Sequence, residues 1–404
     1  MADLISLGVL AASVPREVVD AAVAAQGRSA RRAGGKLPPQ VMVYFAMALA
    51  LFAEEDYEEV MVRLSETLAW WGCWDAGWTV PTSGGITQAR ARLGSGPVAE
   101  VFQAVAVPVA DLLTPGAWLG PWRLMAIDGF DWDLPDTADN VAEFGYAGSG
   151  ANRSAFPKAR AVTISECASH AVVAAGIGPM SIGEQTLARD LYPELDSDWL
   201  LIADRSFYGF VDWNAARAGG GQLLWRVSAS VSLPVLAALA DGSYTSVLIN
   251  PKVRGQARTA LVEAARRGEQ LPAGRAVLVR VVEYTVPDRD GAGYGELIAL
   301  ITTIIDPTQA SAEQLAEAYH QRWEHETGND QLKTHLRGPG RILRSRKPDT
   351  VRQEIYGYLL THCAISALIC RAATEAGIDP DRVKFLRTVR IIRRRVADPA
   401  AFSP

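Results

Sequence analysis

Cysteine and histidine are scarce in this sequence of 404 residues, which contains only 4 cysteines and 5 histidines. The cysteines are too scattered for a disulfide scaffold and lack the paired spacing of a zinc site, so we expect reduced, structural thiols. They are Cys73, Cys167, Cys363 and Cys370. The clustered histidines do not show the four-residue spacing of a helical metalloprotease, and we expect them at the surface. They are His320, His325 and His335. The sequence therefore predicts no zinc centre.

A long apolar run is also missing. The longest one, VMVYFAMALALFA from Val41 to Ala53, is too short to cross a bilayer, which requires about 20 residues. The N-terminus has neither the basic start nor the cleavage site of a signal peptide. We therefore expect a cytoplasmic protein without a membrane partner.

The chain has no overall excess of positive charge. Its net charge of -5 argues at first against a nucleic-acid partner. The charge is uneven, however, because residues 333–396 contain 15 Lys and Arg against 5 Asp and Glu, whereas the rest of the chain contains 25 against 40. This asymmetry indicates that a polyanion binds at one end. The alternative is that residues 383–396, VKFLRTVRIIRRRV, form a basic amphipathic helix that packs on the body.

Five regions with different patterns follow one another, and together they predict an α+β fold of several domains. The first is helical and rich in alanine, the second mixes strands and helices, the third is rich in strands, and the last two are helical, the final one being basic. Their bounds are 1–119, 120–220, 221–306, 307–345 and 346–404. Ser311 and Gln314 are spaced as a capping box at the start of the fourth region's first helix.

Two arginines in the first region, Arg90 and Arg92, lie at the end of a helix that follows a Gly-Gly turn. In a helix-turn-helix such residues contact phosphates. A purely structural role for both is an equally good interpretation.

Two apolar runs end in an aspartate. WRLMAID leads into Asp128, and WLLIAD leads into Asp204. A buried strand places a carboxylate at the edge of a sheet in this way. We therefore expect both side chains at strand ends.

A helical segment in the fourth region, YHQRWEHETGNDQLK, carries an aromatic residue, two cations and an acid on one stripe. At about 100° per residue, they fall within about 60° of one another. They are Tyr319, Arg322, Glu326 and Lys333. The alternative is a solvated face with ion pairs between turns. Gly328 weakens the continuity of this helix by about 1 kcal/mol.

Two acids at strand ends and one acid on a helix suit a two-metal phosphoryl-transfer site. Carboxylates hold a pair of hard divalent ions about 4 Å apart, one for the attacking oxygen and one for the leaving oxygen. Arg322 and Lys333 would then hold a phosphodiester against those ions.

Three blocks identify the family that this chain resembles. AIDGFDWDLPDTADNVAEFG, IADRSFYGF and AYHQRWEHETGNDQLKTHLRG, in this order, resemble the catalytic blocks of the DDE transposases of the insertion sequence 4 family. The third block matches that family's pattern of Tyr, two residues, Arg, three residues, Glu, six residues and Lys. The helical start is also similar to the family's N-terminal domain, so the resemblance covers nearly the whole chain.

The resemblance implies a DNA transposase with a ribonuclease-H-like core, which the β-rich insertion at 221–306 interrupts before the third acid. Asp128, Asp204 and Glu326 would be the catalytic ligands of two Mg²⁺ ions, with Mn²⁺ as an alternative. The enzyme would cut the ends of an insertion sequence and join them to target DNA through a hairpin intermediate. Its partners would be double-stranded DNA and a second copy of the chain, in a bacterial cytoplasm at the nucleoid.

The resemblance also implies roles for residues around the acids. Tyr319, Arg322 and Lys333 would grip phosphates, and Arg205 and Phe207 would support the second acid. Trp225 and Trp323 are candidates for stacking on a flipped base, with ordinary core packing as the alternative for each.

Two other functions stay open at this point. The first is a transposase-derived DNA-binding protein that represses or inhibits transposition without chemistry. The second is a phosphatase with Asp128 as its nucleophile. That chemistry usually requires an acid two residues later, where this sequence has Phe130, so the phosphatase is disfavoured.

Overall fold

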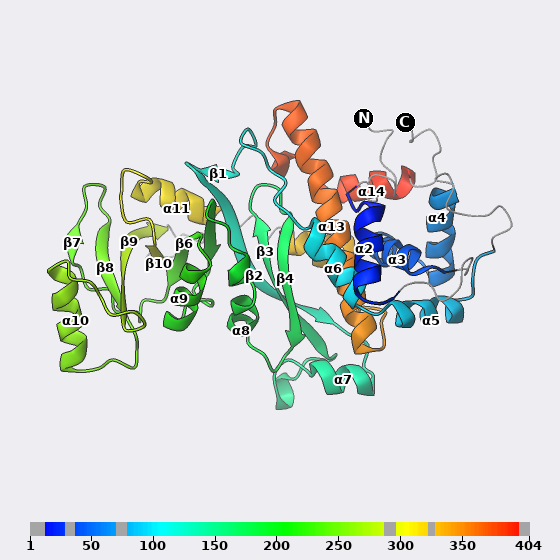
Figure 1. Cartoon of the computed structure of the whole chain (residues 1–404), viewed down its shortest axis with the longest axis horizontal. Helices are drawn as coiled ribbons and strands as arrows, with labels where there is room; N and C mark the ends of the chain where they lie inside the picture. Colours follow the sequence, from blue (N-terminus) through cyan, green and yellow to red (C-terminus); the bar gives the residue numbers. More distant parts are fainter. Residues whose placement is uncertain (1–12, 29–36, 70–78, 287–295, 322–327, 396–404) are drawn as a thin grey trace.

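A mixed sheet runs through the middle of the molecule, and helices gather at one end of it (Figure 1). The computed structural model describes residues 13–28, 37–69, 79–286, 296–321 and 328–395. Within these residues, ten strands join in a single sheet. The α+β fold class predicted from the sequence is confirmed.

The first region is helical, as predicted, and is built around one apolar helix. Its helices are α2 (Arg16–Ala25), α3 (Pro39–Leu51), α4 (Tyr57–Ala69), α5 (Ser83–Leu93) and α6 (Gly96–Val105). Every residue of α3 from Val41 to Leu51 is buried. A helix that is apolar all round must be enclosed, and α13 (Pro348–Ala376) packs along it. A Cβ at Gly357 would lie 2.3 Å from the carbonyl oxygen of Ala46, so the two helices touch backbone to backbone.

The central strands lie in the order β4-β3-β2-β5-β6. β2 pairs antiparallel with β3, and β3 pairs antiparallel with β4, whereas β5 is parallel to both β2 and β6. This is the strand order of a ribonuclease-H-like core, which confirms the fold that the resemblance implied. The strands are β1 (Trp118–Leu119), β2 (Trp122–Asp133), β3 (Lys158–Glu166), β4 (Val172–Pro179), β5 (Trp199–Ala203) and β6 (Gln222–Val227).

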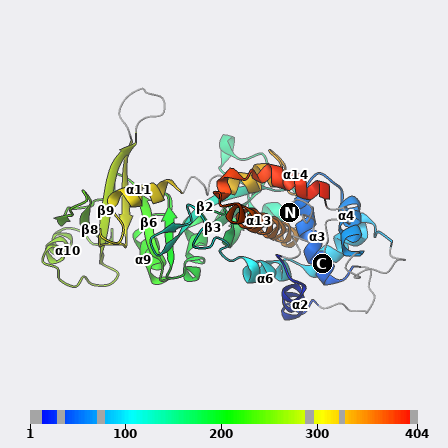
Figure 2. The same cartoon turned by 90° about the horizontal axis from the view of Figure 1, so that it is seen from above.

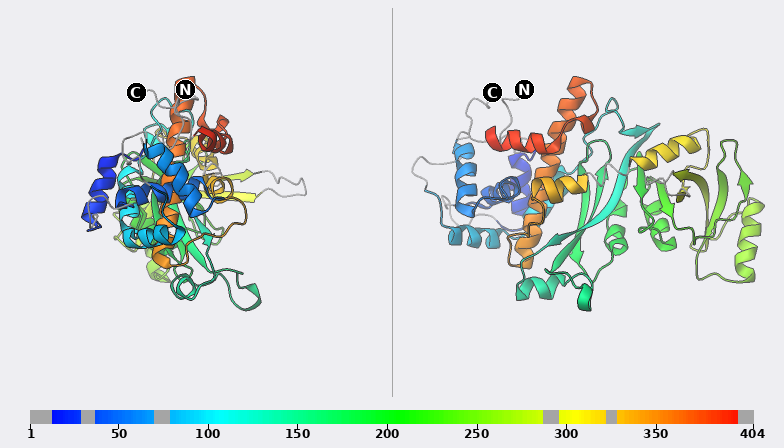
Figure 3. Two further views of the ribbon diagram at one scale, coloured as in Figure 1. Left: turned by 90° about the vertical axis from the view of Figure 1, so that its right-hand side faces the viewer. Right: turned by 180° about the vertical axis from the view of Figure 1, so that it is seen from behind.

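Helices cover both faces of this core. Because side chains alternate along a strand, Leu124 and Leu200 share one face and pack with residues of α11 (Ala312–His320). α11 crosses the face seen from behind (Figure 3). Met125 and Leu201 point to the opposite face and pack with α8 and α9. The connecting helices are α7 (Ala138–Phe144), η2 (Gly150–Asn152), α8 (Glu184–Arg189), η3 (Tyr192–Glu194) and α9 (Phe210–Ala218).

The strand-rich region, as far as residues 221–286 and 296–306 are described, continues the same sheet. β6 is the parallel neighbour of β5, and β10 pairs antiparallel with β6. The strands β7 to β9 extend the sheet away from the helical end (Figure 2). The elements are β7 (Ala237–Ala238), β8 (Tyr244–Ile249), α10 (Gln256–Arg266), β9 (Ala276–Val286) and β10 (Glu296–Thr302).

A buried ion pair ties this extension to α11. Arg280 is fully buried and pairs with Asp241. Asp241 Oδ2 also accepts a hydrogen bond from the backbone N–H of Ala312 at 2.7 Å, and Arg280 Nη1 donates to the carbonyl oxygen of Ala310 at 2.7 Å. The extension therefore fixes the start of the helix that leads to Tyr319.

The last regions are helical, and α11 begins at the predicted capping box. Ser311 Oγ accepts from the Gln314 N–H at 3.2 Å, and Gln314 Oε1 accepts from the Ser311 N–H at 2.9 Å. Residues 328–330 are helical and lead into a π-helix. The remaining elements are the π-helix η4 (Gln331–Leu336), α13, η5 (Pro380–Arg382) and α14 (Phe385–Arg395).

Two features of the C-terminal helices bear on the sequence analysis. By length and composition alone α13 could span a membrane, but 72% of its most apolar window is buried inside the protein. In α14, Phe385, Val389 and Ile392 are buried in the core that α13 shares with the N-terminal helices. The basic helix therefore packs on the body, as the alternative interpretation of its charge proposed.

Candidate active site

Two aspartates lie at the centre of the sheet on neighbouring parallel strands. Ile127 of β2 is the register partner of Ala203 of β5. The residues that follow are Asp128 and Asp204, so these carboxylates occupy adjacent positions on strands about 4.8 Å apart and point to the same face. Both residues are partly buried. Parallel pairing has brought together two acids that are far apart in the sequence.

Each carboxylate accepts hydrogen bonds that fix its orientation. Asp128 Oδ1 accepts from the backbone N–H of Gly129 at 2.8 Å, and its Oδ2 accepts from the side-chain amide of Asn329 at 3.3 Å. Asp204 Oδ1 accepts from the hydroxyl of Tyr319 at 3.4 Å. A carboxylate has about four lone-pair sites on its two oxygens, so a carboxylate that accepts hydrogen bonds can also bind a cation.

Tyr319 is the first residue of the predicted stripe. It lies near the end of α11 and is buried, and its hydroxyl points at the second acid. The structure therefore brings Tyr319 to the pair of aspartates.

Lys333 lies in the π-helix, on the same side of the sheet as the acids. Its ammonium group is 5.3 Å from the centre of the Phe130 ring. Phe130 follows Asp128 by two residues on β2, so both side chains point to the same face. Lys333 is partly exposed and so can reach a ligand there.

The third predicted acid, Glu326, lies outside the described residues, as do Arg322 and Trp323. The described residues on either side of this segment contact the two aspartates. Tyr319 hydrogen-bonds to Asp204, and Asn329 hydrogen-bonds to Asp128.

Other predicted residues lie elsewhere. Phe207 and Trp225 are fully buried in the core on the opposite face of the sheet, where Trp225 stacks edge-on against Trp213 at 5.4 Å. The structure does not bring Trp225 to the aspartates. Arg205 directly follows Asp204 and is exposed.

The two arginines of the first region differ sharply. Arg92 is exposed, whereas Arg90 is only 2% exposed. The Arg90 guanidinium donates to Gln353 at 2.9 Å and to Ser345 at 2.9 Å, as well as to the Tyr57 hydroxyl at 2.6 Å. For Arg90 this geometry favours the structural interpretation.

Comparison with known proteins identifies the family. Residues 4–103 match the family described as insertion element 4 transposase N-terminal, and residues 121–364 match the family described as transposase DDE domain. The chain belongs to the insertion sequence 4 family of DDE transposases.

Two relatives from Escherichia coli agree with this assignment. The chain is 26% identical over 373 residues to transposase InsG for insertion sequence element IS4 of Escherichia coli (strain K12), an alignment that covers 91% of this chain and 78% of InsG. It is 29% identical over 136 residues to the putative transposase InsZ of the same organism. This alignment covers 33% of this chain and 45% of InsZ. Among solved structures, the piggyBac transposase synaptic complex with hairpin DNA aligns with 98% of this chain and 82% of its own, at a TM-score of 0.49 and 10% identity.

DDE transposase domains generally depend on a divalent metal, and the two described acids fit one. Hard divalent cations prefer carboxylate oxygens, and the adjacent strands present two carboxylates to one face. Within the described residues no group of three or more Asp, Glu, His or Cys gathers in a metal-binding arrangement. Glu326, which the resemblance implies as the third acid, lies outside them.

Sequence reasoning missed Asn329 and a further acid near this DDE site. The sequence analysis assigned no role to Asn329, although it lies three residues after Glu326. Glu184, on the opposite face, packs so closely on Gly129 that a Cβ there would lie 2.5 Å from its carboxyl carbon. Burial raises the pKa of Glu184, as do the charges of Asp128 and Asp131, whereas Arg160 lowers it. No sequence spacing links Glu184 to the acids.

Proposed function

We propose that this transposase cuts the ends of an insertion sequence and joins them to target DNA by two-metal phosphoryl transfer, through a hairpin intermediate. The observation that carries the proposal is the adjacent placement of Asp128 and Asp204 on one face of the sheet. Residues that flank Glu326 in the sequence support it, because they hydrogen-bond to these same acids.

In this mechanism Asp128, Asp204 and Glu326 hold two Mg²⁺ ions, or Mn²⁺ in their place. When bound, these ions activate the attacking oxygen and stabilise the leaving oxygen of an in-line displacement. The Tyr319 hydroxyl and the Asn329 amide orient the carboxylates. Lys333, and Arg322 from the segment beside Glu326, bind the phosphates and neutralise their charge.

One site serves several successive steps, because each is the same kind of displacement at phosphorus. Water first cleaves the phosphodiester at the element's end and frees a 3′ hydroxyl. That hydroxyl attacks a phosphodiester of the opposite strand, which displaces the 3′ hydroxyl of the flanking DNA and closes a hairpin. Water then opens the hairpin and regenerates the 3′ hydroxyl of the element for attack on target DNA. No covalent bond between enzyme and DNA is required.

Double-stranded DNA is the partner in this proposal, with two copies of the chain pairing two ends in the bacterial cytoplasm. Among the predicted DNA-binding cations within the described residues, Arg92 is exposed and Lys333 is partly exposed, so both are available to DNA phosphates. A transposase-derived repressor or inhibitor is the second candidate function, since it would use the same DNA-binding surface without cutting.

The test is cleavage of DNA that spans the native borders of this coding region, with and without Mg²⁺. We expect nicks and hairpins at the border from the wild-type protein. Asp204→Asn and Glu326→Gln should abolish them. Asp131→Asn is the matched control, because Asp131 lies on the same strand as Asp128 but points to the opposite face, where it faces Arg160 at 3.6 Å. Binding without cleavage by the wild-type protein would instead establish the non-catalytic function.

A further inference from the structure

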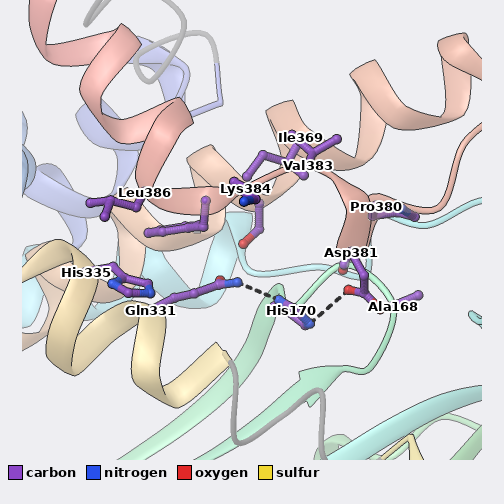
Figure 4. Close-up of a pocket in the computed structure, with 13 residues that line it drawn as sticks. Ala168, His170, Gln331, His335, Ile369, Pro380, Asp381, Val383, Lys384 and Leu386 are labelled. Atoms are coloured by element: carbon purple, nitrogen blue, oxygen red, sulfur yellow. Dashed lines mark hydrogen bonds and ion pairs between the residues drawn. The ribbon is translucent and has the colours of Figure 1, made fainter.

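A buried amide joins three elements next to the active site. Gln331 is the first residue of the π-helix and is only 7% exposed. Its Nε2 lies 2.8 Å from Nδ1 of His170 in the turn between β3 and β4, and its Oε1 lies 3.1 Å from Nε2 of His362 in α13. Figure 4 shows Gln331 reaching His170, with Asp381 on the far side of the ring.

The chemistry of the amide fixes the direction of each hydrogen bond. Because an amide nitrogen can only donate, Gln331 donates to Nδ1 of His170, whose own proton then resides on Nε2. That nitrogen lies 3.3 Å from Oδ1 of Asp381. Because an amide oxygen can only accept, His362 donates from Nε2 to Gln331. The two rings and the amide thus hold one another in defined tautomers.

The backbone around His170 is built for this contact. His170 has a φ of 59°, and it is the one residue other than glycine with a positive φ in the described parts of the chain. Such a conformation is strained and persists only where its surroundings hold it. A Cβ at Gly328 would lie 3.3 Å from Cβ of His170, so the segment after Glu326 packs directly on this turn.

The position of this segment determines what faces the acids. Asn329, two residues before Gln331, reaches Asp128, and Lys333, two residues after it, lies over Phe130. The segment is a π-helix, in which the Arg337 N–H donates to the carbonyl oxygen of Leu332 at 3.2 Å. A π-turn alters which residues share a face, so an anchor is required to fix the rotation of the segment.

We propose that Gln331 is a positioning residue for the transposase reaction, and that its bridge between His170 and His362 sets the rotation in which Asn329 and Lys333 face the acids. This inference rests on the proposed function. Gln331 hydrogen-bonds to the two histidines rather than to the acids, and it acts through Asn329 and Lys333. Gln331 lines a cavity of about 330 Å³, and Lys384 and Leu386, at the start of α14, line the same cavity.

The test compares Gln331→Met with a matched control, Gln353→Met. Methionine keeps the length of the side chain but forms neither hydrogen bond. Gln353, which lies in α13, is buried like Gln331. Its side-chain amide donates to the carbonyl oxygens of Arg90 and Gly94 at 3.1 and 2.7 Å. Its replacement therefore removes a comparable bridge that does not contact the π-helix.

Two measurements on the full chain separate positioning from a structural role. In single-turnover cleavage of border DNA with Mg²⁺, we expect Gln331→Met to be slower by about tenfold, equivalent to about 1.4 kcal/mol in activation free energy. Its Kd for the same DNA without metal should rise by a smaller factor than the rate falls, because Lys333 is one of several cations that bind the phosphates. Gln353→Met should melt at a lower temperature but cleave at the wild-type rate below its melting transition. A wild-type cleavage rate for Gln331→Met, or equal losses in rate and DNA affinity, would overturn the inference.

Hydrogen exchange of residues 328–337 in the DNA-free protein tests the anchor even if the wild-type protein proves unable to cut. We expect faster exchange there in Gln331→Met but not in Gln353→Met, and unchanged exchange would refute the anchor independently of the proposed function. His170→Gly serves as a second variant if Gln331→Met folds poorly. Glycine tolerates the positive φ, so this change removes the ring without straining the turn and should have the same effect on cleavage and exchange.

Discussion

Replacement of Arg90 by methionine should destabilise the protein rather than weaken its contact with DNA. Methionine retains much of the side-chain length and removes every guanidinium donor. Four hydrogen bonds are lost, to Gln353, Tyr57, Ser345 and the carbonyl oxygen of Thr350. Most of these acceptors lie far along the chain, so the change cuts the link between α5 and the α13 region.

The magnitude follows from burial and charge. Hydrogen bonds to a charged group contribute about 1.5 to 3 kcal/mol each, and deleting one partner leaves buried acceptors without a donor. The four bonds are coupled and do not add, so we expect Arg90→Met to lower the local free energy of unfolding by about 3 to 5 kcal/mol. Arg92→Met is the control, because Arg92 is exposed on the same helix and should change stability by less than about 0.5 kcal/mol.

The assay is hydrogen exchange of the α5 amides at increasing urea, together with fluorescence anisotropy of labelled border DNA at one fixed salt concentration. DNA affinity depends steeply on salt, so the concentration must match between variants. The reasoning would be refuted if Arg90→Met kept the wild-type exchange rates while binding DNA more weakly. That outcome would restore Arg90 as a phosphate contact.

Three further perturbations test the packing and the charges. Gly357→Ala should destabilise α13 against α3 by about 1 to 3 kcal/mol, since the added Cβ meets a backbone carbonyl that cannot move aside; an unchanged melting temperature would contradict this. Burial raises the pKa of the Cys363 thiol to about 12 and also raises that of Cys370. Neither thiol should therefore react with a disulfide reagent at pH 8 until urea is added, and fast labelling of native protein would disprove their burial. Burial alone would raise the pKa of Asp241, but hydrogen bonds and a neighbouring arginine lower it overall. The stability that this carboxylate contributes is therefore present above its ordinary pKa and lost as the pH falls through the lower folded value. The difference in unfolding free energy between wild type and Asp241→Asn should be about 3 kcal/mol at pH 7 and shrink below about pH 4, and a difference that grew in acid would reverse this assignment.

Local chemistry determined what the sequence could predict. An apolar run that ends in an aspartate predicts a buried strand wherever the strand later lies, and Asp204 does directly follow the end of β5. The prediction of a strand end was wrong for Asp128, because β2 continues to Asp133 and holds Asp128 within the strand. Ser311 and Gln314 are three residues apart, and their capping box requires only the backbone between them. The family pattern around Tyr319 and Lys333 is likewise contained in 15 residues.

Long-range pairing decided the rest. Trp225 and Leu224 are neighbours in sequence, yet strand alternation sends one to the face opposite the acids and the other to the same face. Arg90 is buried because Gln353, 263 positions away, accepts its hydrogen bond. Gln331 had no local feature to mark it, since its partners His170 and His362 come from a strand turn and a distant helix. The sequence by itself predicted which residues would carry the chemistry. The tertiary structure alone decided which of them share a face, because that depends on strand register and on packing between segments far apart in the chain.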